Sequence, residues 1–268
     1  MDQNESIENQ WKALLLGLHP GLRRGRHFFS LLPSEPRCKL CNAPFAGVGG
    51  ASVKVLFNKK QAVGNPNFCN FCDDFARNNP GGAEIELTLL FADVRGSTTL
   101  AEKMSPSEFS RLMSRFYGAA TQVLTRSDAF INKIVGDEVV AHYYPGFAGS
   151  NHAARAISAA EALLEATGHA RESGPWLPVG VAVHTGVAFV GVMKSYGVME
   201  FTALGDVVNT AARIAGHARQ GEILVSKATC DAAGIGFNES ERRTLELKGK
   251  TEPVDVKTLG VGRSPAAK

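Results

Sequence analysis

The sequence lacks the features that place a protein in a membrane or outside the cell. No stretch reaches the run of roughly 18 apolar residues that a bilayer span requires. The amino terminus is acidic and has neither the basic segment nor the cleavage pattern of a signal peptide. We therefore expect no membrane span and a cytoplasmic location.

A large charge of either sign is also missing. The net charge of +3 is too small to imply a polyanionic partner. It is uneven, because residues 1–83 hold ten Lys and Arg against six Asp and Glu, a difference of +4, which leaves −1 for the rest. The basic positions at Arg23, Arg24 and Arg26 could contact nucleic acid or anionic lipid. A solvated basic face is the commoner meaning of such a segment, so no nucleic-acid partner is expected.

Cysteine is scarce, with five in 268 residues, but four of the five form two close pairs. The pattern is C-x₂-C-x₂₇-C-x₂-C, made by Cys38, Cys41, Cys69 and Cys72. In a protein that is not secreted, such pairs favour a metal over disulfides, and Zn²⁺ is the commonest ion for four thiolates. A zinc-ribbon or treble-clef-like module is expected, with a strand pair near residues 53–57. An Fe–S cluster, a redox-sensing dithiol and the absence of any metal stay open. Cys230 stands alone and is predicted to be a buried apolar residue.

Composition and chain breakers divide the sequence. With 44% hydrophobic residues the chain can bury at least one full core. The expected segments are a helical and basic part at 1–37, the cysteine module at 38–83, a large domain at 84–262 and a disordered tail at 263–268. The first contains a helix over residues 7–18 followed by a basic connection, and the cluster NNPGG at 78–82 marks the main boundary.

From residue 84 onward, strands and helices of ordinary globular length alternate. Ser105 and Pro106 predict the N-cap and first turn of a helix that extends to about residue 126. Strands are expected at 85–94, 129–135, 139–144, 179–184, 187–193, 198–203, 223–225, 243–247 and 254–259, and further helices at 152–167 and 206–217. The order β-α-β-β-α-β predicts an α+β fold of ferredoxin-like type, with a layer of helices on an antiparallel sheet.

Two aspartates follow strand-like runs in this order. Asp93 ends the first strand, and Asp137 lies in the turn between the second and third. The crossover makes the first two strands parallel and places the third, antiparallel, between them, so both carboxylates reach one edge of the sheet. Such a pair can hold two divalent cations, as phosphoryl or nucleotidyl transfer requires. Gly96, with Ser97 and Thr98 after it, offers backbone amides to phosphate oxygens.

Four motifs resemble the catalytic domain of the class III nucleotidyl cyclases. They are FADVRGST at residues 91–98, NKIVGDE at 132–138, GVAVHTG at 180–186 and FTALGDVVNTAAR at 201–213. The likeness covers about residues 84–260, roughly two thirds of the chain. It implies a cyclase homology domain that uses two Mg²⁺ or Mn²⁺ ions per active site.

The resemblance also implies roles for single residues. Asp93 and Asp137 correspond to the two metal-binding aspartates, with Val94 beside them at the metal site. Asp93, or solvent, could also accept the proton that leaves the attacking hydroxyl. Lys133 and Thr202 correspond to the residues that read the purine, as the Lys/Thr pair of one bacterial branch.

Further correspondences concern the ribose and the triphosphate. Asn209 matches the asparagine that orients the ribose, and Arg213 matches the arginine that stabilises the transition state. Their spacing of four residues on a predicted helix puts both on one face, which agrees with a shared ligand. The run LKGK at residues 247–250 matches the segment with a triphosphate-binding lysine, which is either Lys248 or Lys250.

The base-reading pair favours ATP. Adenine presents an acceptor at N1 and a donor at N6, which suit the ammonium of Lys133 and the hydroxyl of Thr202. Guanine presents N–H donors instead and would call for a carboxylate in place of Lys133. Glu138 does not meet that need, because it follows the metal aspartate. His184 lies in a strand and is expected to be a packed residue instead of a ligand.

The inferred protein is thus an adenylate cyclase in signal transduction that converts ATP to 3′,5′-cyclic AMP and pyrophosphate. The family's members work as homodimers with active sites at the subunit interface, so a homodimer is implied here. Two alternatives stay open. One is a cyclase-like module that binds nucleotide without turnover, and the other is a cyclase that uses GTP or a pyrimidine triphosphate.

Overall fold

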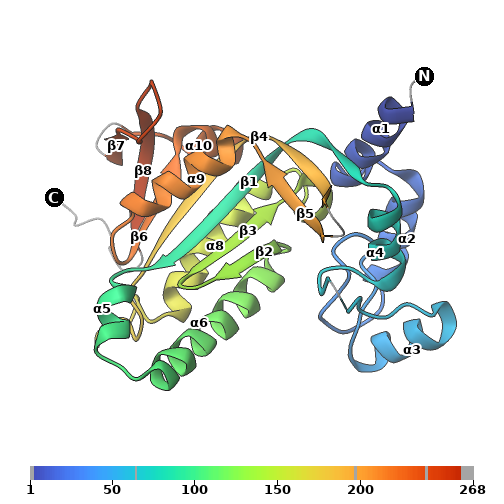
Figure 1. Cartoon of the computed structure of the whole chain (residues 1–268), viewed down its shortest axis with the longest axis horizontal. Helices are drawn as coiled ribbons and strands as arrows, with labels where there is room; N and C mark the ends of the chain where they lie inside the picture. Colours follow the sequence, from blue (N-terminus) through green and yellow to red (C-terminus); the bar gives the residue numbers. More distant parts are fainter. Residues whose placement is uncertain (1–2, 64, 196–197, 239–240, 261–268) are drawn as a thin grey trace. The chain divides into compact units, whose positions relative to one another are not determined.

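The computed structural model describes residues 3–63, 65–195, 198–238 and 241–260 (Figure 1). The tail predicted at 263–268 lies outside them. The chain groups into two compact units. The first unit comprises Met1–Ile85, Tyr144–Ser150 and Val187–Leu204, and the second comprises Glu86–Tyr143, Asn151–Gly186 and Gly205–Lys268.

The first unit is mostly helical in its amino-terminal part. Its helices are α1 (Gln3–Leu15), α2 (Pro20–Ser30), α3 (Gly47–Phe57), α4 (Asn70–Asn78) and the short α7 (Pro145–Ala148). The expected helix at 7–18 begins earlier and ends before Gly17, whose φ of 71° only glycine adopts readily. The expected basic connection is instead α2. The ring nitrogen of His19 accepts the Leu22 backbone N–H at its start, and Pro20 occupies the first turn.

The strand pair expected near residues 53–57 is wrong, because this segment belongs to helix α3. Its β-branched and aromatic residues suggested strands, but Val53 is buried and residues 54–57 are all exposed, so the alternating burial of a half-buried strand is missing. Gly49 packs its backbone against Pro33 so closely that a Cβ would lie 2.0 Å from that carbonyl oxygen. This close approach holds the segment in a conformation that the local pattern does not indicate.

One eight-stranded sheet has the strand order β2-β3-β1-β4-β6-β8-β7, and β5 pairs with β4. The strands are β1 (Gly81–Val94), β2 (Phe130–Val135), β3 (Glu138–Tyr143), β4 (Val179–Ser195), β5 (Val198–Leu204), β6 (Glu222–Ser226), β7 (Arg242–Leu245) and β8 (Val254–Gly260). The α+β class is confirmed. The sheet is mixed and not wholly antiparallel, because β4 and β6 run parallel. The expected placement of the third strand between the first two is confirmed by the order β2-β3-β1.

Strand β4 corrects a second detail. Residues 179–184 and 187–193 were expected as separate strands, but they form one continuous strand. Gly186 lies in the gap that was expected between them. A Cβ at Gly186 would lie 2.9 Å from the Val207 side chain. The glycine therefore allows the helix that contains Val207 to pack against the strand, and it does not form a turn.

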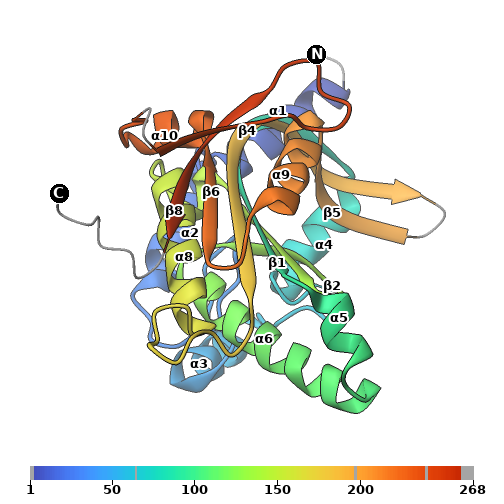
Figure 2. The ribbon, with the colours of Figure 1, turned by 90° about the vertical axis from the view of Figure 1, so that its left-hand side faces the viewer.

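The helices of the second unit are α5 (Ser97–Glu102), α6 (Pro106–Arg126), α8 (His152–Ala166), α9 (Asp206–His217) and α10 (Lys227–Ala233). Helix α6 packs on α8 and on β2, as Figures 1 and 2 show. The predicted α6 start is confirmed by a complete capping box between Ser105 and Glu108. Cys230 on α10 is fully buried, as predicted. Within the described part of the chain, no helix has the length and apolarity to cross a bilayer.

Candidate active site

The end of β1 and the β2–β3 turn bring the two predicted aspartates together. Asp93 lies opposite Glu138 in the β1–β3 register, and Glu138 lies opposite Val135 in the β2–β3 register. Asp137 therefore sits in the turn beside the end of β1, where its carbonyl accepts the Val94 backbone N–H at 3.1 Å. The topology inferred from sequence correctly placed both carboxylates at one edge.

Two glycines shape this edge. Gly136 and Gly96 have φ angles of 60° and 68°, in the left-handed region that side chains disfavour. Gly136 gives the β2–β3 hairpin its two-residue turn, and the Tyr117 hydroxyl donates to its carbonyl oxygen. Gly96 precedes α5, where the Ser97 hydroxyl donates to the Asp137 carboxylate. This hydrogen bond fixes the Asp137 carboxylate at the start of α5.

The electrostatics of this edge fit a cation. Burial raises the pKa of Asp93, and the nearby Asp137 charge raises it further, while Arg95 opposes both. Burial likewise raises the pKa of Glu138, with contributions from Asp93 and Asp137. Besides burial, Asp137 thus raises the pKa values of Asp93 and Glu138, which indicates negative charge that the fold neutralises only in part. Hard divalent cations prefer such oxygen donors, so these residues fit the expected Mg²⁺ or Mn²⁺ ions.

Sequence reasoning missed Arg95. Its guanidinium forms an ion pair with the Asp93 carboxylate and donates to the carbonyl oxygens of Ala215 and Ala218 at 3.3 and 3.4 Å. Arg95 thereby ties the end of β1 to the end of α9. Its positive charge, two residues after Asp93 in the sequence, was the signal that could have identified the ion pair.

Lys133 and Thr202 lie in different units. Lys133 is exposed on β2, directly after a β-bulge that interrupts pairing between residues 131 and 133. Bulges reorient the following side chains. The positive charge of Lys133, after burial, lowers the pKa of His142 on the neighbouring strand to about 3. Thr202 is half-buried on β5 of the first unit.

Helix α9 presents the other predicted residues. Asn209 is exposed and Arg213 half-buried, one helical turn apart. The Arg213 guanidinium lies 3.5 Å from the point that a Cβ on Gly249 would occupy, so it borders the LKGK turn. Lys250 forms an ion pair with Asp206 at the start of α9. The residues predicted to contact the ribose and the triphosphate thus lie on α9 or beside it.

Two smaller expectations concern Lys248 and His184. Lys248 is exposed, whereas Lys250 is half-buried and its ammonium is held by Asp206. The His184 ring is half-buried and pairs with the Ser226 hydroxyl at 2.8 Å. Burial lowers the pKa of His184 to about 4, and Lys250 contributes to that shift. His184 is therefore a neutral hydrogen-bonding residue at neutral pH.

The first unit contains a candidate metal centre. The Sγ atoms of Cys38, Cys41, Cys69 and Cys72 are buried and all lie within 4.8 Å of one another. The sulfurs of Cys41 and Cys69 are 3.7 Å apart. Zinc–thiolate bonds in a tetrahedron separate the sulfurs by about 3.8 Å. This spacing fits one ion, whereas a multi-iron cluster would hold the thiolates farther apart. We call the group the four-cysteine centre.

A hydrogen-bond donor and a cation lie beside the sulfurs of the four-cysteine centre, as negatively charged thiolates require. The Cys69 backbone N–H donates to the Cys38 sulfur at 3.2 Å. The Lys59 ammonium lies 3.9 Å from the Cys41 sulfur and 3.8 Å from that of Cys69. Burial lowers the pKa of Lys59, but attraction to the four cysteines outweighs it and raises the pKa overall. A cationic side chain here offsets part of the negative charge of a four-thiolate ion complex.

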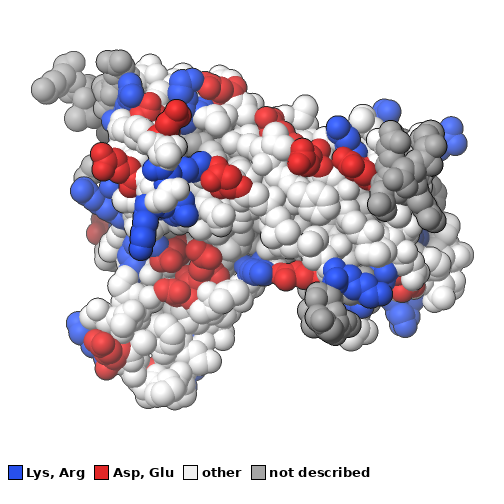
Figure 3. Space-filling model, turned by 45° about the horizontal axis from the view of Figure 1, so that its top comes forward, with Lys and Arg blue, Asp and Glu red and all other residues white. Residues whose placement is uncertain are grey.

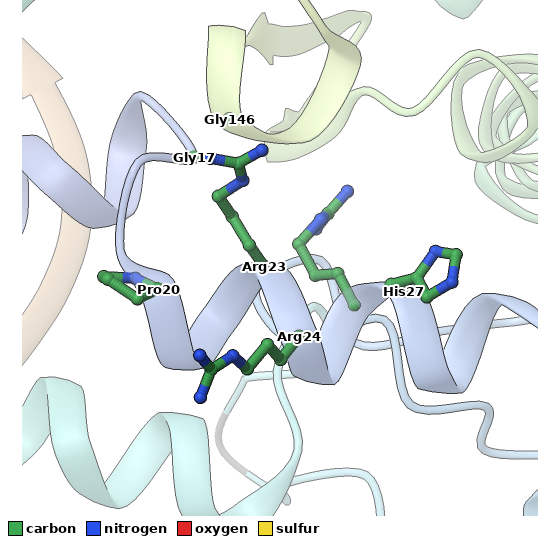
Figure 4. Close-up of a pocket in the computed structure, with 7 residues that line it drawn as sticks. Gly17, Pro20, Arg23, Arg24, His27 and Gly146 are labelled. Atoms are coloured by element: carbon green, nitrogen blue, oxygen red, sulfur yellow. The ribbon is translucent and has the colours of Figure 1, made fainter.

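A basic cavity along α2 accounts for the arginines noted in the sequence. Figure 4 shows the Arg23 side chain pointing toward Gly17 and Gly146, while Arg24 extends to the other side of the helix. Arg26 is structural, because its guanidinium donates to the carbonyl oxygens of Lys39 and Leu40 at 2.7 and 3.1 Å. On the face in Figure 3, acidic and basic side chains lie side by side, with no broad field of one sign.

A family model described as the adenylate and guanylate cyclase catalytic domain matches residues 83–259. This chain belongs to that family. The match begins at β1 and ends at β8, so the cyclase domain includes every site residue inferred for nucleotide chemistry. The four-cysteine centre lies outside it.

Curated relatives of the cyclase domain include adenylate cyclases. Adenylate cyclase 1 of Rhizobium meliloti is 30% identical over 187 residues, covering 67% of this chain and 28% of that protein. The terminal-differentiation specific adenylate cyclase of Dictyostelium discoideum is 30% identical over 178 residues, covering 63% of this chain and 8% of that protein. The chain therefore spans less than a third of the length of either protein.

Solved structures show the same fold. The crystal structure of the guanylyl cyclase Cya2 has a TM-score of 0.61 and 26% identity, covering 69% of this chain and 98% of that chain. The adenylyl cyclase CyaB from P. aeruginosa has a TM-score of 0.57 and 24% identity, covering 67% of this chain and 96% of that chain. These similar proteins are named for both purines, so their names do not decide the base.

Proposed function

We propose that this cyclase domain is an adenylate cyclase that converts ATP to 3′,5′-cyclic AMP and pyrophosphate. The observation that carries the proposal is the convergence of Asp93 and Asp137 at one sheet edge, joined through the Val94–Asp137 backbone hydrogen bond. Membership of the cyclase family gives this carboxylate pair its chemistry. The ribose 3′-oxygen attacks the α-phosphorus and pyrophosphate leaves.

Each residue has a distinct task in this proposal. Asp93 and Asp137 hold two Mg²⁺ or Mn²⁺ ions, with Val94 beside them. When bound, these ions neutralise the triphosphate and lower the pKa of the attacking hydroxyl. Asn209 orients the ribose through its amide, and Arg213 stabilises the phosphate charge that grows in the transition state. The backbone amides at Gly96, Ser97 and Thr98 face triphosphate oxygens, together with Lys248 or Lys250.

The choice of ATP rests on Lys133 and Thr202. The Lys133 ammonium donates to adenine N1, and the Thr202 hydroxyl accepts from N6. Guanine would place an N–H group against the ammonium and lose that hydrogen bond. Lys133 is exposed, as a residue that meets a ligand must be.

We further propose a homodimer in which one subunit supplies Asp93, Asp137 and Lys133 and the other supplies Asn209 and Arg213. The exposure of Asn209 on α9 supports this arrangement, since the residue is available to a second chain. The cytoplasmic location and the role in signal transduction expected from the sequence stay predictions.

For the four-cysteine centre we propose one Zn²⁺. The mutual spacing of the sulfurs within 4.8 Å and the donor from Cys69 support a single tetrahedral ion. The ion closes its coordination with four thiolates and leaves no position for substrate, so it is structural. Elemental analysis of wild type against Cys38→Ser tests this, and iron in place of zinc would contradict it.

The base is tested by incubating the purified chain with each nucleoside triphosphate and Mn²⁺ or Mg²⁺. Cyclic AMP should be the main product. In Lys133→Glu, turnover of ATP should fall by about a hundredfold while GTP becomes the better substrate, because a carboxylate accepts from guanine N–H groups. Equal use of ATP and GTP by the wild type would contradict the assignment of the base. Nucleotide binding without any cyclic product would favour a non-catalytic module.

A further inference from the structure

The residue before Thr202 sits in an aromatic cage. Phe201 on β5 is 9% exposed, and its ring lies 5.5 Å from Phe68, 5.8 Å from Trp11 and 6.0 Å from Tyr144. Those three rings are themselves buried, and all four residues belong to the first unit. Successive side chains of a strand point to opposite faces, so Phe201 anchors one face of β5 while Thr202 occupies the other.

Two of the cage rings depend on the second cysteine pair. Phe68 directly precedes Cys69, the N-cap of α4. Trp11 lies 5.7 Å from Phe75 of the same helix, and its indole N–H donates to the Asn79 carbonyl at the helix end at 3.0 Å. The contacts of Phe201 with Phe68 and Trp11 therefore rest on a helix that begins with two sulfur ligands.

The third ring connects to the first cysteine pair. Arg26 donates to the carbonyls of Lys39 and Leu40, the two residues between Cys38 and Cys41, and also to the Phe147 carbonyl at 3.3 Å. The Phe147 ring lies 5.2 Å from that of Tyr144, which completes the cage. Both cysteine pairs are thus joined to Phe201 by separate contacts.

We propose that the ion in the four-cysteine centre fixes the β4–β5 hairpin through Phe201 and thereby sets the position of Thr202 for base recognition. Without the ion, the bonds that join the two cysteine pairs are missing, so the pairs lose their order together with the rings they hold. The anchoring of the hairpin is independent of catalysis. The effect on base recognition rests on the proposed adenylate cyclase function.

Trp11 reports the anchoring directly. The chain has two tryptophans, so Trp176→Phe leaves Trp11 as the single emitter. Removing the ion from this variant with a mercurial and EDTA should shift its emission to longer wavelength and speed hydrogen exchange in residues 189–194 and 200–204 by about tenfold or more. Added Zn²⁺ should reverse both changes. Ion loss that leaves emission and exchange unchanged, or a chain that binds no ion, overturns the proposal.

A matched pair of variants tests the link to Thr202. Phe68→Ala removes a buried ring from the cage. Phe71→Ala removes a ring that lies between Cys69 and Cys72 but is 48% exposed. Both should retain zinc. Phe68→Ala should raise the KM for ATP by about tenfold and reduce the preference for ATP over GTP. The reason is that a small displacement of Thr202 has large kinetic effects. Phe71→Ala should behave as wild type.

The two proposals fail differently. If zinc-loaded wild type forms no cyclic nucleotide, the proposed function is wrong, and emission and exchange still decide the anchoring. If wild type is active and Phe68→Ala matches Phe71→Ala in KM and base preference, the link from the four-cysteine centre to Thr202 is wrong.

Discussion

At the scale of single residues, neighbouring carboxylates on the β2–β3 turn differ in task. Asp137 accepts a hydrogen bond from the Ser97 hydroxyl, whereas Glu138 has a raised pKa, first from burial and then from both aspartates. The positions of Asp93 and Asp137 were predictable, because a turn and a strand end define them. The hydrogen bonds of Arg95 to the carbonyl oxygens of Ala215 and Ala218 were not, since these residues lie 120 or more positions away in the sequence.

Asp137→Asn and Glu138→Gln form a matched pair. Asp137→Asn should lower cyclic AMP formation by at least about a hundredfold, because it removes a cation ligand. Glu138→Gln should lose less than about tenfold. Initial rates at saturating Mn²⁺ measure both, and equal losses in the two variants would count against the assignment.

The raised pKa of Glu138 also predicts a dependence of stability on pH. A carboxyl with a raised folded pKa stabilises the fold at low pH, and this contribution is lost as the pH rises through the folded pKa. Without divalent ions, Glu138→Gln should therefore have a higher Tm than wild type at pH 8, and the difference should shrink toward pH 4. A lower Tm at pH 8 would contradict the prediction.

His142 predicts the opposite trend in acid. Burial lowers its folded pKa to about 3, so the unfolded chain alone binds this proton as the pH falls below 6.5. The free energy of unfolding should decrease by up to about 1.4 kcal/mol per pH unit on its account. In urea unfolding measured from pH 7 to pH 4, the free energy of unfolding should decrease less steeply for His142→Gln than for wild type. An unchanged slope would show that other groups govern acid unfolding.

At the scale of elements, sequence signals predicted a helix or strand correctly where neighbouring residues alone determine it. Helix α6 was predicted because Ser105, Pro106 and Glu108 form a start signal that needs no distant partner. The failures at α3 and within β4 share one cause. Gly49 and Gly186 each allow the backbone to pack closely against a residue elsewhere in the sequence. A local sequence pattern contains the glycine but not the residue that it contacts.

The capping box gives a prediction for α6. Ser105→Ala should lower the free energy of unfolding by about 1 kcal/mol, because the Glu108 backbone N–H loses its acceptor. Ser114→Ala, on the exposed middle of the same helix, should be neutral or slightly stabilising. Chemical denaturation compares the two. Equal stability of both variants would mean that the cap contributes nothing.

At the scale of the whole molecule, the two units cut across the order of the sequence. The breaker cluster near residue 80 marks the start of β1, but Tyr144–Ser150 and Val187–Leu204 group with the amino-terminal residues. The cage around Phe201 links these segments, because its members come from four distant parts of the chain. No periodicity or turn signal predicts such contacts, whereas motif order alone sufficed to identify the cyclase domain.

The proposed dimer predicts complementation. Asp137→Asn and Arg213→Ala chains should each be nearly inactive, since each lacks one half of both sites. When mixed, heterodimers contain one intact site, so the mixture should regain up to about a quarter of wild-type activity. Mixing two Asp137→Asn preparations provides the control. A mixture as inactive as its components would contradict a shared site.

The formation of cyclic AMP from ATP tests the central claim most directly. Zinc-loaded wild type, incubated with ATP labelled at the α-phosphorus and with Mn²⁺, should release labelled 3′,5′-cyclic AMP and pyrophosphate in equal amounts. Asp93→Asn, which keeps the size of the side chain and removes its charge, should form at least about a hundredfold less. Product from Asp93→Asn at the wild-type rate, or no product from wild type, would contradict the account.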